Sequence, residues 1–264
     1  MQIIGEKING TRKAVARAIR ERDANAIRDL AAHQAEAGAA WLDVNAGTHP
    51  DQEADDLIWL IENDQAVTDV PLCLDSANPQ ALNVAIQAVA RTPMINSISG
   101  EPERLDNVLP IVAEHGCQVI ALAMGGTRIP ETCDERMEVV RTVMEATRAA
   151  GVPDEHVYVD PLAMTLGTNT ESAVTALDTM RAIRAAYPEA HLTIGLSNIS
   201  FGLPARSQIN RTFLTLAMQA GLDSAILDPL DRDLRAAILS TGLVLGRDRH
   251  CLNYVRAARA GLFE

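Results

Sequence analysis

Short apolar runs that end in an aspartate or asparagine recur along this chain, and each is followed by a segment with helical spacing. The run that begins at His191 stops abruptly at Ser197 and Asn198, as a buried parallel strand does when it delivers polar side chains to its carboxyl end. Other apolar runs end in the same way, at Asn9, Asp43, Asn45, Asp75, Asn96, Asp160 and Asp228. This repetition constrains the fold more than any other feature of the sequence.

The spacing of these units predicts a closed barrel. Strand and helix alternate at intervals of about 25 to 40 residues, as right-handed crossovers between parallel strands require. Eight such units close a TIM (β/α)8 barrel, so we expect an α/β fold in a single domain over residues 1–264. A doubly wound open sheet is the alternative, but the loop after the first run lacks GxGxxG and the chain contains no P-loop motif.

The runs and the periodic segments define the expected elements. Strands are expected at 2–9, 41–47, 71–76, 94–97, 119–124, 156–161 and 224–229, and from 191 to the polar residues 197 and 198. Helices are expected at 11–37, from about 51, and at 78–90, 102–115, 134–150, 171–186, 208–220, 231–245 and 251–260. Gly38 is expected to end the first helix, and Ser207 to cap the helix at 208–220.

The charge of the chain excludes one class of partner. The formal net charge is -12, whereas binding to a phosphate backbone needs clustered Lys and Arg. Nucleic acid is therefore not an expected ligand. Aromatic residues make up only 3% of the chain against 47% hydrophobic residues, so we expect an aliphatic core, which suits helices stacked over a parallel sheet.

The location of the protein is predicted from features that the chain lacks. No apolar segment approaches the roughly 20 residues of a membrane span, and the first residues do not have the layout of a signal peptide. We therefore expect a cytoplasmic protein that does not bind a membrane. The four cysteines form no CxxC pair, and Cys73 and Cys117 fall in or beside apolar runs, so buried free thiols are expected rather than a zinc or dithiol site.

Polar residues at the strand ends predict a binding site. In a barrel the carboxyl ends of the strands converge on one face, which brings together Asp75, Asn96, Asp160 and Asn198. Asp43 and Asn45 share one face of their strand because side chains alternate with period two. Carboxylates accept hydrogen bonds and amides both donate and accept, so the set suits a neutral heterocycle with adjacent amino, ring N–H and carbonyl groups.

A metal site is the rival use for these acids. Glu6, Asp43, Asp75, Asp160 and Asp228 are a source of the oxygen ligands that hard cations prefer. The amides among the strand ends, and the lack of a histidine at any carboxyl end, argue against this use. The histidines of the strands, His156 and His191, stand at strand starts, where we expect a structural role. We therefore assign no metal ligands.

Several segments, in order over nearly the whole chain, resemble the pterin-binding methyltetrahydrofolate methyltransferase family. This family includes the free-standing enzymes that exchange methyl groups with corrinoid proteins, and the folate domain of cobalamin-dependent methionine synthase. The matching segments are GEKIN (5–9), LDVNAG (42–47), CLDS (73–76), MINS (94–97), VDP (159–161) and GLSNISFGLP (195–204), followed by Arg206 and 209–211.

The resemblance implies roles for residues and the identity of the ligands. It implies that methyltetrahydrofolate or tetrahydrofolate is the substrate and that a corrinoid (cobalamin) is carried by a transient partner protein. It also implies a homodimer. Asp75, Asn96 and Asp160 match residues that hold the pterin edge, Asn198 matches the amide near N5, Gly195 and Ser197 match residues that flank the pterin, Arg206 matches an arginine near the folate tail, and Asp43 and Asn45 match residues of the barrel mouth.

The expected reaction moves a methyl group between N5 of methyltetrahydrofolate and the cobalt of the corrinoid. A methyl group on a tertiary amine leaves poorly unless N5 is protonated or gains a hydrogen bond as charge develops. Our hypothesis is that Asn198 donates this hydrogen bond, with Asp160 or Asp75 and ordered water relaying the proton. The Co(I) nucleophile comes from the partner, which accounts for the lack of an evident activated Ser, Cys or Lys.

Three other functions are compatible with a barrel of this kind. Dihydropteroate synthase shares the pterin-binding barrel, but it has a lysine on the strand-seven loop, where Asn198 stands here, and basic residues for a pyrophosphate leaving group. A folate-binding module without turnover is the second alternative, and the nearly complete set of site residues argues against it. A metal-dependent lyase is the third, and loss of activity on chelation would support it.

Overall fold

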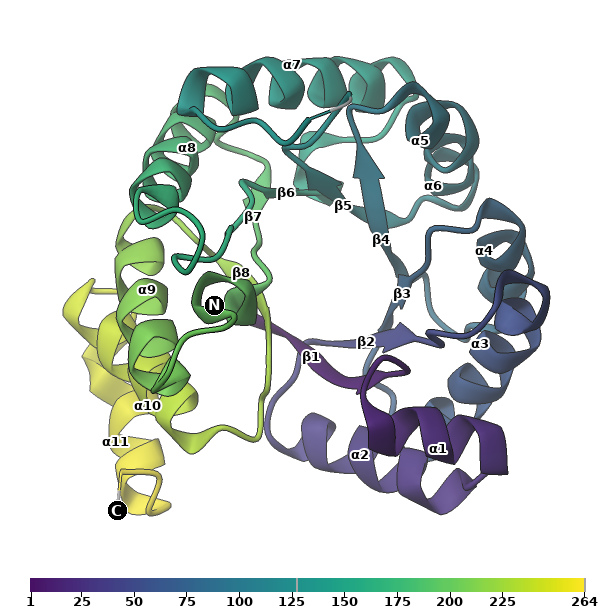
Figure 1. Ribbon diagram of the computed structural model, residues 1–264. Coiled ribbons are helices and arrows are strands. Elements are labelled where there is room, and N and C mark those ends of the chain that lie inside the picture. Colours follow the sequence, from purple (N-terminus) through teal and green to yellow (C-terminus); the bar gives the residue numbers. More distant parts are fainter. Residues whose placement is uncertain (127, 264) are drawn as a thin grey trace.

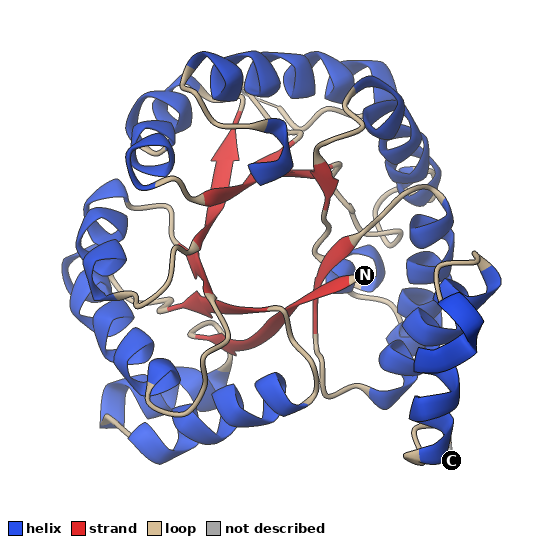
Figure 2. Cartoon of the chain, turned by 180° about the vertical axis from the view of Figure 1, so that it is seen from behind, coloured by secondary structure: helices blue, strands red, loops and turns tan. Residues whose placement is uncertain are grey.

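The computed structural model describes residues 1–126 and 128–263 of the chain. Within these residues, eight parallel strands pair in sequence order from β1 to β7, and β8 pairs with β1. Helices surround this ring of strands on the outside, and Figures 1 and 2 view it from the two ends of the barrel axis. The predicted TIM barrel is confirmed.

The strands follow the predicted runs closely. They are β1 (Gln2–Asn9), β2 (Trp41–Asn45), β3 (Leu72–Asp75), β4 (Met94–Ser99), β5 (Gln118–Leu122), β6 (Val157–Asp160), β7 (His191–Leu192) and β8 (Ser224–Leu227). The helices are α1 (Lys13–Glu21), α2 (Ala24–Glu36), α3 (Pro50–Gln65), α4 (Pro79–Ala85), α5 (Pro102–Asn107), α6 (Leu109–His115), α7 (Cys133–Ala149), α8 (Ser172–Ala186), α9 (Arg206–Gln219), α10 (Arg232–Val244) and α11 (Leu252–Arg259). Short 3-10 turns are η1 (Ile86–Ala88), η2 (Asp154–His156), η3 (Leu196–Ser200) and η4 (Arg249–Cys251).

The barrel closes between β7 and β8, where the strand is shortest. β7 is two residues long, so the strand that we expected to reach Ser197 and Asn198 ends much earlier. Backbone hydrogen bonds continue past it, from Ile226 N to the Ile194 carbonyl at 2.9 Å and through a bridge between Gly195 and Ile226. These bonds seal the barrel wall although the segment after Gly195 has already turned into η3.

A small apolar cluster fills the barrel below its mouth. Alternate side chains of the strands point inward, as period two requires. The cluster consists of Ile4, Trp41, Cys73, Met94, Ile120 and Tyr158, all buried. At its lower end the Gln2 side chain accepts hydrogen bonds from Trp41 Nε1 at 3.3 Å and from the Tyr158 hydroxyl at 3.0 Å. Apolar side chains thus occupy the lower interior and leave the carboxyl ends to polar ones.

Two predicted helices are each divided in two. The segment 11–37 breaks at Arg22, which lies in the left-handed region with φ of 53°, and the Asp23 side chain then caps α2 by accepting a bond from Ala26 N. The segment 102–115 breaks at Val108 between α5 and α6. Apolar periodicity continues through both breaks, so it did not reveal them.

The start of α9 also differs from the prediction. Ser207 was expected as the cap, but it lies inside α9, which begins at Arg206. Ala205 takes the cap position in a left-handed conformation, with φ of 52°. The segment from η3 therefore enters α9 through a left-handed alanine and not through a serine cap.

Two of the structural predictions are confirmed. Cys73 and Cys117 are buried free thiols. His191, at the start of β7, stacks on the Tyr158 ring with centroids 4.5 Å apart and lies 3.1 Å from an Asp223 carboxylate oxygen through Nδ1. His191 thus ties the lower ends of β6, β7 and β8 together, which is the structural role that we expected.

Among the residues that the structure describes, no helix combines the length and the apolar character needed to cross a membrane.

Candidate active site

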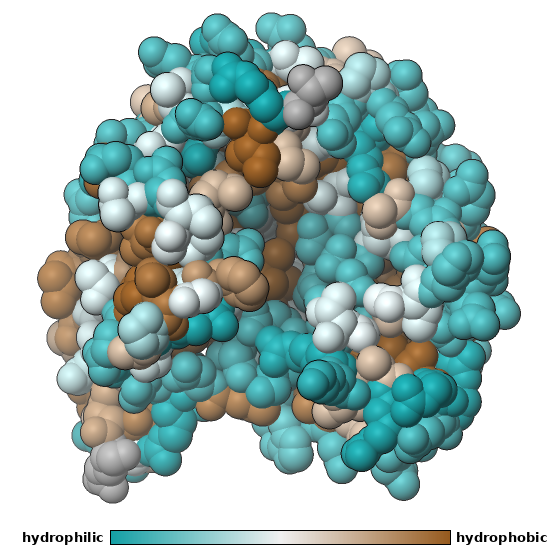
Figure 3. Space-filling model, viewed as in Figure 1, coloured by the Kyte–Doolittle hydropathy of each residue, from teal (hydrophilic) through white to brown (hydrophobic). Residues whose placement is uncertain are grey.

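The candidate site lies at the carboxyl ends of the strands, which face the viewer in Figure 1. The space-filling view of the same face shows a hollow at the centre of the ring (Figure 3). Its rim is hydrophilic over much of its length, and an apolar patch lies near the start of α9. Phe201, which precedes α9, is 68% exposed.

One side of the mouth is built from β2, β3 and β4. The Asn45 side-chain amide donates a hydrogen bond to Asp75 Oδ2 at 2.8 Å, and the Asn96 amide donates one to Asp43 Oδ1 at 3.1 Å. Each pair joins side chains that the barrel brings together from distant parts of the sequence. The strands therefore bring four of the predicted site residues together in two amide–carboxyl pairs.

Burial raises the pKa of both carboxyls on this side, Asp43 and Asp75. Burial, and then the nearby charge of Asp75, raise the pKa of Asp43 to about 8. The pKa of Asp75 is raised as well, chiefly by burial, although its bond from Asn45 opposes the shift. Asp43 thus carries a proton at neutral pH and can both donate and accept, which widens the range of ligand groups that this side can contact.

Asp160 stands at the end of β6, on the other side of the mouth. One oxygen of its carboxyl accepts a bond from Leu162 N at 2.8 Å, and the backbone of Gly195 also donates to it. Burial raises the pKa of Asp160 to about 6, while these two bonds and the charge of Arg136 oppose the shift. At pH 7 the group is mostly ionised, so its remaining lone pairs can accept bonds from ligand N–H groups.

Asn198 lies in η3 rather than at a strand end, and it is exposed. Its backbone N–H donates to the Gly195 carbonyl at 3.2 Å. A Cβ atom added at Gly195 would lie 3.0 Å from Asn198 Nδ2, closer than almost all such contacts, so glycine leaves room for the amide. Ser197, beside it, is half-buried. The structure therefore groups Gly195, Ser197 and Asn198 at the mouth, next to Asp160.

Arg206 holds this segment from the first turn of α9. Its Nη2 donates to the Ser197 carbonyl at 2.6 Å, its Nε donates to Ser200 Oγ at 3.0 Å, and its guanidinium lies 5.9 Å from the centre of the Phe201 ring. These contacts fix the backbone on both sides of Asn198. The proximity to a folate tail that the resemblance implied stays a prediction.

The comparison with family models decides what kind of protein carries this site. The model described as "Pterin binding enzyme" matches residues 5–228, a range that begins within β1 and ends directly after β8. This chain belongs to the pterin-binding enzyme family. The match includes every residue of the predicted site.

Curated relatives of this pterin-binding enzyme include folate and corrinoid enzymes. The methylcorrinoid:tetrahydrofolate methyltransferase of Eubacterium limosum is 40% identical over 263 residues, which cover 99% of this chain and 97% of that protein. The methionine synthase of Mycobacterium leprae is 31% identical over 238 residues, covering 85% of this chain and 20% of that protein. This chain thus spans about a fifth of the methionine synthase and nearly the whole methyltransferase.

Solved structures similar to this pterin-binding enzyme share its fold. A dihydropteroate synthase from Xanthomonas albilineans in complex with 7,8-dihydropteroate has a TM-score of 0.68 at 22% identity, over 92% of each chain. A dihydropteroate synthase from Coxiella burnetii in complex with pteroic acid has a TM-score of 0.65 at 17% identity, over 92% of this chain and 94% of that one. These identities establish the barrel fold only.

Two acids considered as metal ligands are paired with cations in this pterin-binding enzyme. Lys7 Nζ donates to Asp228 Oδ2 at 2.7 Å, and Arg12 Nη2 donates to Glu6 Oε1 at 2.7 Å. Among the described residues, no group of three or more His, Cys, Asp or Glu side chains is placed to hold a metal ion. The sequence did not reveal these ion pairs. Lys7 and Asp228 are 221 residues apart, and Arg12 lies beyond the end of the strand that carries Glu6.

Arg136 is a residue near the site that our sequence analysis missed. It is buried in α7, 2% exposed, and donates from Nη1 to the carbonyls of Pro161 and Leu162, just beyond Asp160. A signal was present, because Arg136 occupies the same buried stripe of α7 as Val140 and Val143. A charged residue in an apolar stripe points to a specific partner.

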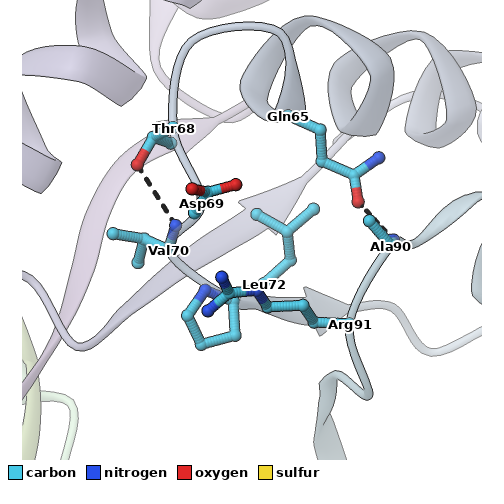
Figure 4. Close-up of a pocket in the computed structure, with 8 residues that line it drawn as sticks. Gln65, Thr68, Asp69, Val70, Leu72, Ala90 and Arg91 are labelled. Atoms are coloured by element: carbon cyan, nitrogen blue, oxygen red, sulfur yellow. Dashed lines mark hydrogen bonds between the residues drawn. The ribbon is translucent and has the colours of Figure 1, made fainter.

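A separate cavity of about 50 Å³ lies at the opposite end of the barrel. It is formed at the start of β3, where Val70 N donates to Thr68 Oγ1 at 3.2 Å and Gln65 accepts a bond from Ala90 N (Figure 4). Leu72 lines it, three residues before Asp75 at the carboxyl end of the same strand. It is therefore separate from the candidate site.

Proposed function

We propose that this protein transfers a methyl group between N5 of methyltetrahydrofolate and the cobalt of a corrinoid carried by a partner protein. The observation that carries the proposal is the 40% identity to a methylcorrinoid:tetrahydrofolate methyltransferase over 99% of this chain. The polar groups of the barrel mouth support it, because acids and amides on both sides match the hydrogen-bonding edge of a pterin.

Pterin recognition is assigned to Asp75, Asn96 and Asp160, with Asp43 and Asn45 lining the mouth beside them. The ionised Asp160 accepts hydrogen bonds from the pterin amino and ring N–H groups. The amide–carboxyl pairs of β2, β3 and β4 supply both donors and acceptors, which suits a ring with an adjacent carbonyl. Gly195 and Ser197 flank the ring, and Arg206 lies toward the folate tail.

Assistance at N5 is assigned to Asn198. A side-chain amide can act without being ionised, because its N–H can donate to the electron pair that develops on N5 as the methyl group leaves, and its oxygen can accept from N5–H once N5 is protonated. Asp160 or Asp75, with ordered water, relays the proton to N5. The exposure of Asn198 is compatible with this role, because the corrinoid partner must reach the methyl group at the open mouth.

The protein is further proposed to form a homodimer through its outer helices. A largely apolar groove lies between α8 and α9; Ala173, Ile209 and Leu216 line it, and Leu216 is 47% exposed. Exposed apolar surface of this kind marks contacts between chains. Light scattering is expected to give a mass of twice 28.4 kDa, and a charged substitution at Leu216 is expected to reduce it to a single chain.

The decisive experiment joins binding to turnover. Purified protein is titrated with methyltetrahydrofolate in a calorimeter, and free Co(I) cobalamin is then added while the absorbance of methylcobalamin is followed. Binding followed by methyl transfer is the expected result. Binding without transfer, to free cobalamin and to corrinoid proteins alike, would leave a passive folate module, and absence of binding would refute the proposal.

A further inference from the structure

Arg136 is an unusual residue for the interior of a barrel protein. It is almost completely buried, and within the described part of the chain no carboxylate forms an ion pair with it. Three backbone carbonyls accept its hydrogen bonds instead: Pro130 at 3.2 Å from Nε, and Pro161 and Leu162 at 2.8 and 3.0 Å from Nη1. A buried charge without a direct ion pair is costly, so its contacts need a reason.

The three carbonyls belong to two neighbouring loops. Pro130 lies in the loop between β5 and α7, and Pro161 and Leu162 begin the loop after β6. A guanidinium presents its donors in a rigid, planar fork, which is why one arginine can hold carbonyls from two directions. Arg136 therefore ties these loops to α7 at the carboxyl end of the barrel.

Leu162 has a backbone conformation that needs support. Its φ is 68°, in the left-handed region that side-chain-bearing residues rarely adopt. In this conformation its N–H turns back and donates to Asp160 Oδ1 at 2.8 Å. The strained residue and the site carboxylate are thus joined by one hydrogen bond, and the carbonyl of the same residue is held by Arg136.

We infer that Arg136 is a positioning residue for Asp160. Its guanidinium holds the Pro161–Leu162 turn in the conformation that aims the Leu162 N–H at the carboxylate, and its charge favours the ionised form of that carboxylate. Arg136 does not itself contact the substrate. The inference rests on the proposed function only for the identity of the ligand that Asp160 binds.

The other described elements packed around Asp160 contact it through backbone groups, whereas Arg136 acts on it through its charge. The flanking strands contribute backbone groups: Ala123 N, just after β5, donates to the Asp160 carbonyl, and Gly195, beyond β7, donates to its carboxyl. The titratable rings nearby, Tyr158 on β6 and His191 on β7, stack on each other at the opposite end of the strands. Among the residues that the structure describes, Arg136 is the one whose charge opposes the effect of burial on Asp160.

The first test measures the titration of Asp160 in the ligand-free protein. Carbon-13 NMR of the aspartate carboxyls follows the titration, and Asp160→Asn assigns the signal. In Arg136→Met the midpoint is expected to rise by about one pH unit. Two contributions that favour ionisation are then lost: the charge of Arg136, and the Leu162 N–H that the turn holds against the Asp160 carboxylate. An unchanged midpoint in a folded variant would overturn the inference.

Arg148 provides the matched control on the same helix. It is exposed, bonds the Asp154 carboxylate at 2.8 and 2.6 Å, and covers the Tyr187 ring. Arg148→Met removes an arginine from α7 and is expected to leave the Asp160 midpoint where it is. An equal shift in both variants would show a general effect of helix charge, and the positioning role would be wrong.

One further variant keeps the inference testable if Arg136→Met does not fold, and a second tests the route through the turn if it does. Arg136→Lys keeps the charge but cannot span the three carbonyls, so an intermediate shift is expected. Leu162→Gly added to Arg136→Met removes the strain of the left-handed residue, and it is expected to move the midpoint back toward that of the wild type. If the Asp160 midpoint of the double variant is no closer to that of the wild type than the midpoint of Arg136→Met, then Arg136 does not act on Asp160 through the Pro161–Leu162 turn.

Ligand binding separates this inference from the proposed function. With methyltetrahydrofolate, Arg136→Met is expected to raise KM about tenfold, with a smaller change in kcat, and to move the acid limb of binding to higher pH. If the wild type does not bind methyltetrahydrofolate, the proposed function fails, and the NMR titration still decides the role of Arg136. A fall in kcat alone, at unchanged KM and pH profile, would overturn the positioning role.

Discussion

The two sides of the barrel mouth hold their polar groups in different ways. On the side of β2, β3 and β4, side chains hold one another, as in the pair of Asn45 with Asp75. On the side of β6 and β7, backbone groups and two arginines, the buried Arg136 and Arg206 in the first turn of α9, hold the site. Leu162 N–H bonds Asp160, and Arg206 bonds the carbonyl of Ser197. The first arrangement is set by strand register, and the second by loops.

This difference assigns different tasks to the two sides. Side chains paired across neighbouring strands are fixed by the barrel itself and suit the recognition of a rigid ring. The loop side carries Asn198, whose hydrogen bond changes during the reaction that we propose, and it also borders the apolar patch near the start of α9 (Figure 3). We therefore expect substitutions on the strand side to affect binding and stability, and substitutions at and around Asn198 on the loop side to affect turnover.

The largest effect is expected at Asn198. Asn198→Ala removes the donor to N5, and loss of one such donor costs about 10²–10³-fold in rate, or about 3–4 kcal/mol. Stopped-flow measurement of methylcobalamin formation gives kcat, and calorimetry gives the affinity for methyltetrahydrofolate, which is expected to change little. Asn107→Ala, at an exposed amide of α5 that bonds only its own helix, is the control. Equal losses of affinity and rate would mean that Asn198 serves binding.

The next effect is a dependence of stability on pH through Asp43. Its pKa is raised from 3.8 to about 8 in the folded protein, so the folded state holds a proton that the unfolded state releases above pH 4. The stability that Asp43 contributes is therefore fully present at low pH and is lost as pH rises to 8, by about 1 kcal/mol per pH unit.

Asp43→Asn provides the test of this dependence. Urea unfolding of wild type and variant at pH 5, 6, 7 and 8 gives two curves, and their difference reports Asp43 together with its effect on the nearby Asp75. The variant is expected to lose less stability as pH rises. Parallel curves would mean that Asp43 is ionised in the folded state throughout this range.

A smaller loss is expected at Asp75. Asp75→Asn keeps the shape of the side chain but removes the carboxylate that accepts from Asn45, and it leaves a buried amide opposite another amide. The affinity for methyltetrahydrofolate is expected to fall about tenfold, or about 1.4 kcal/mol, with kcat nearly unchanged. A large fall in kcat at constant affinity would instead place Asp75 in the proton relay.

The smallest effect is expected at Arg206. Arg206→Met removes the bonds to Ser197 and Ser200 that brace the turn around Asn198. We expect kcat to fall about threefold, roughly 0.6 kcal/mol, through looser positioning of the amide. Arg211→Met is the matched control, because Arg211 lies on the same helix and pairs with Asp233 outside the site. A larger effect on KM than on kcat would favour a direct contact with the folate tail.

The strand side of the site was predictable from sequence for a physical reason. The last residue of an apolar run in a parallel barrel lies at the carboxyl end, so Asp75 could be placed by counting alone, as could Asp160 at the end of β6 on the other side. The pairing of Asn96 with Asp43 was not predictable, because it depends on the register between strands and on a choice of side-chain rotamers. The fold itself followed from the alternation of strand and helix.

The loop side was less predictable. The apolar run from His191 reads as a longer strand than the two residues of β7, because burial in the closing seam selects apolar residues whether or not they pair as a strand. The role of Arg136 depends on how α7 lies against the turn after β6, which no local pattern encodes. The left-handed conformations of Leu162 and Ala205 were equally hidden, since neither is a glycine.

The short β7 has a consequence for how such enzymes diversify. From Leu196 onward the chain has left the barrel wall, so the packing of the buried Leu196 and Ile199, and not strand register, constrains its sequence up to the start of α9. Insertions and exchanges in this stretch need not displace the carboxylates at the ends of the other strands. A pterin-binding barrel of this kind can therefore accept new reaction chemistry through exchange of one segment between β7 and α9. Residues 196–205 are that segment, and they are the residues to graft when the activity is redesigned.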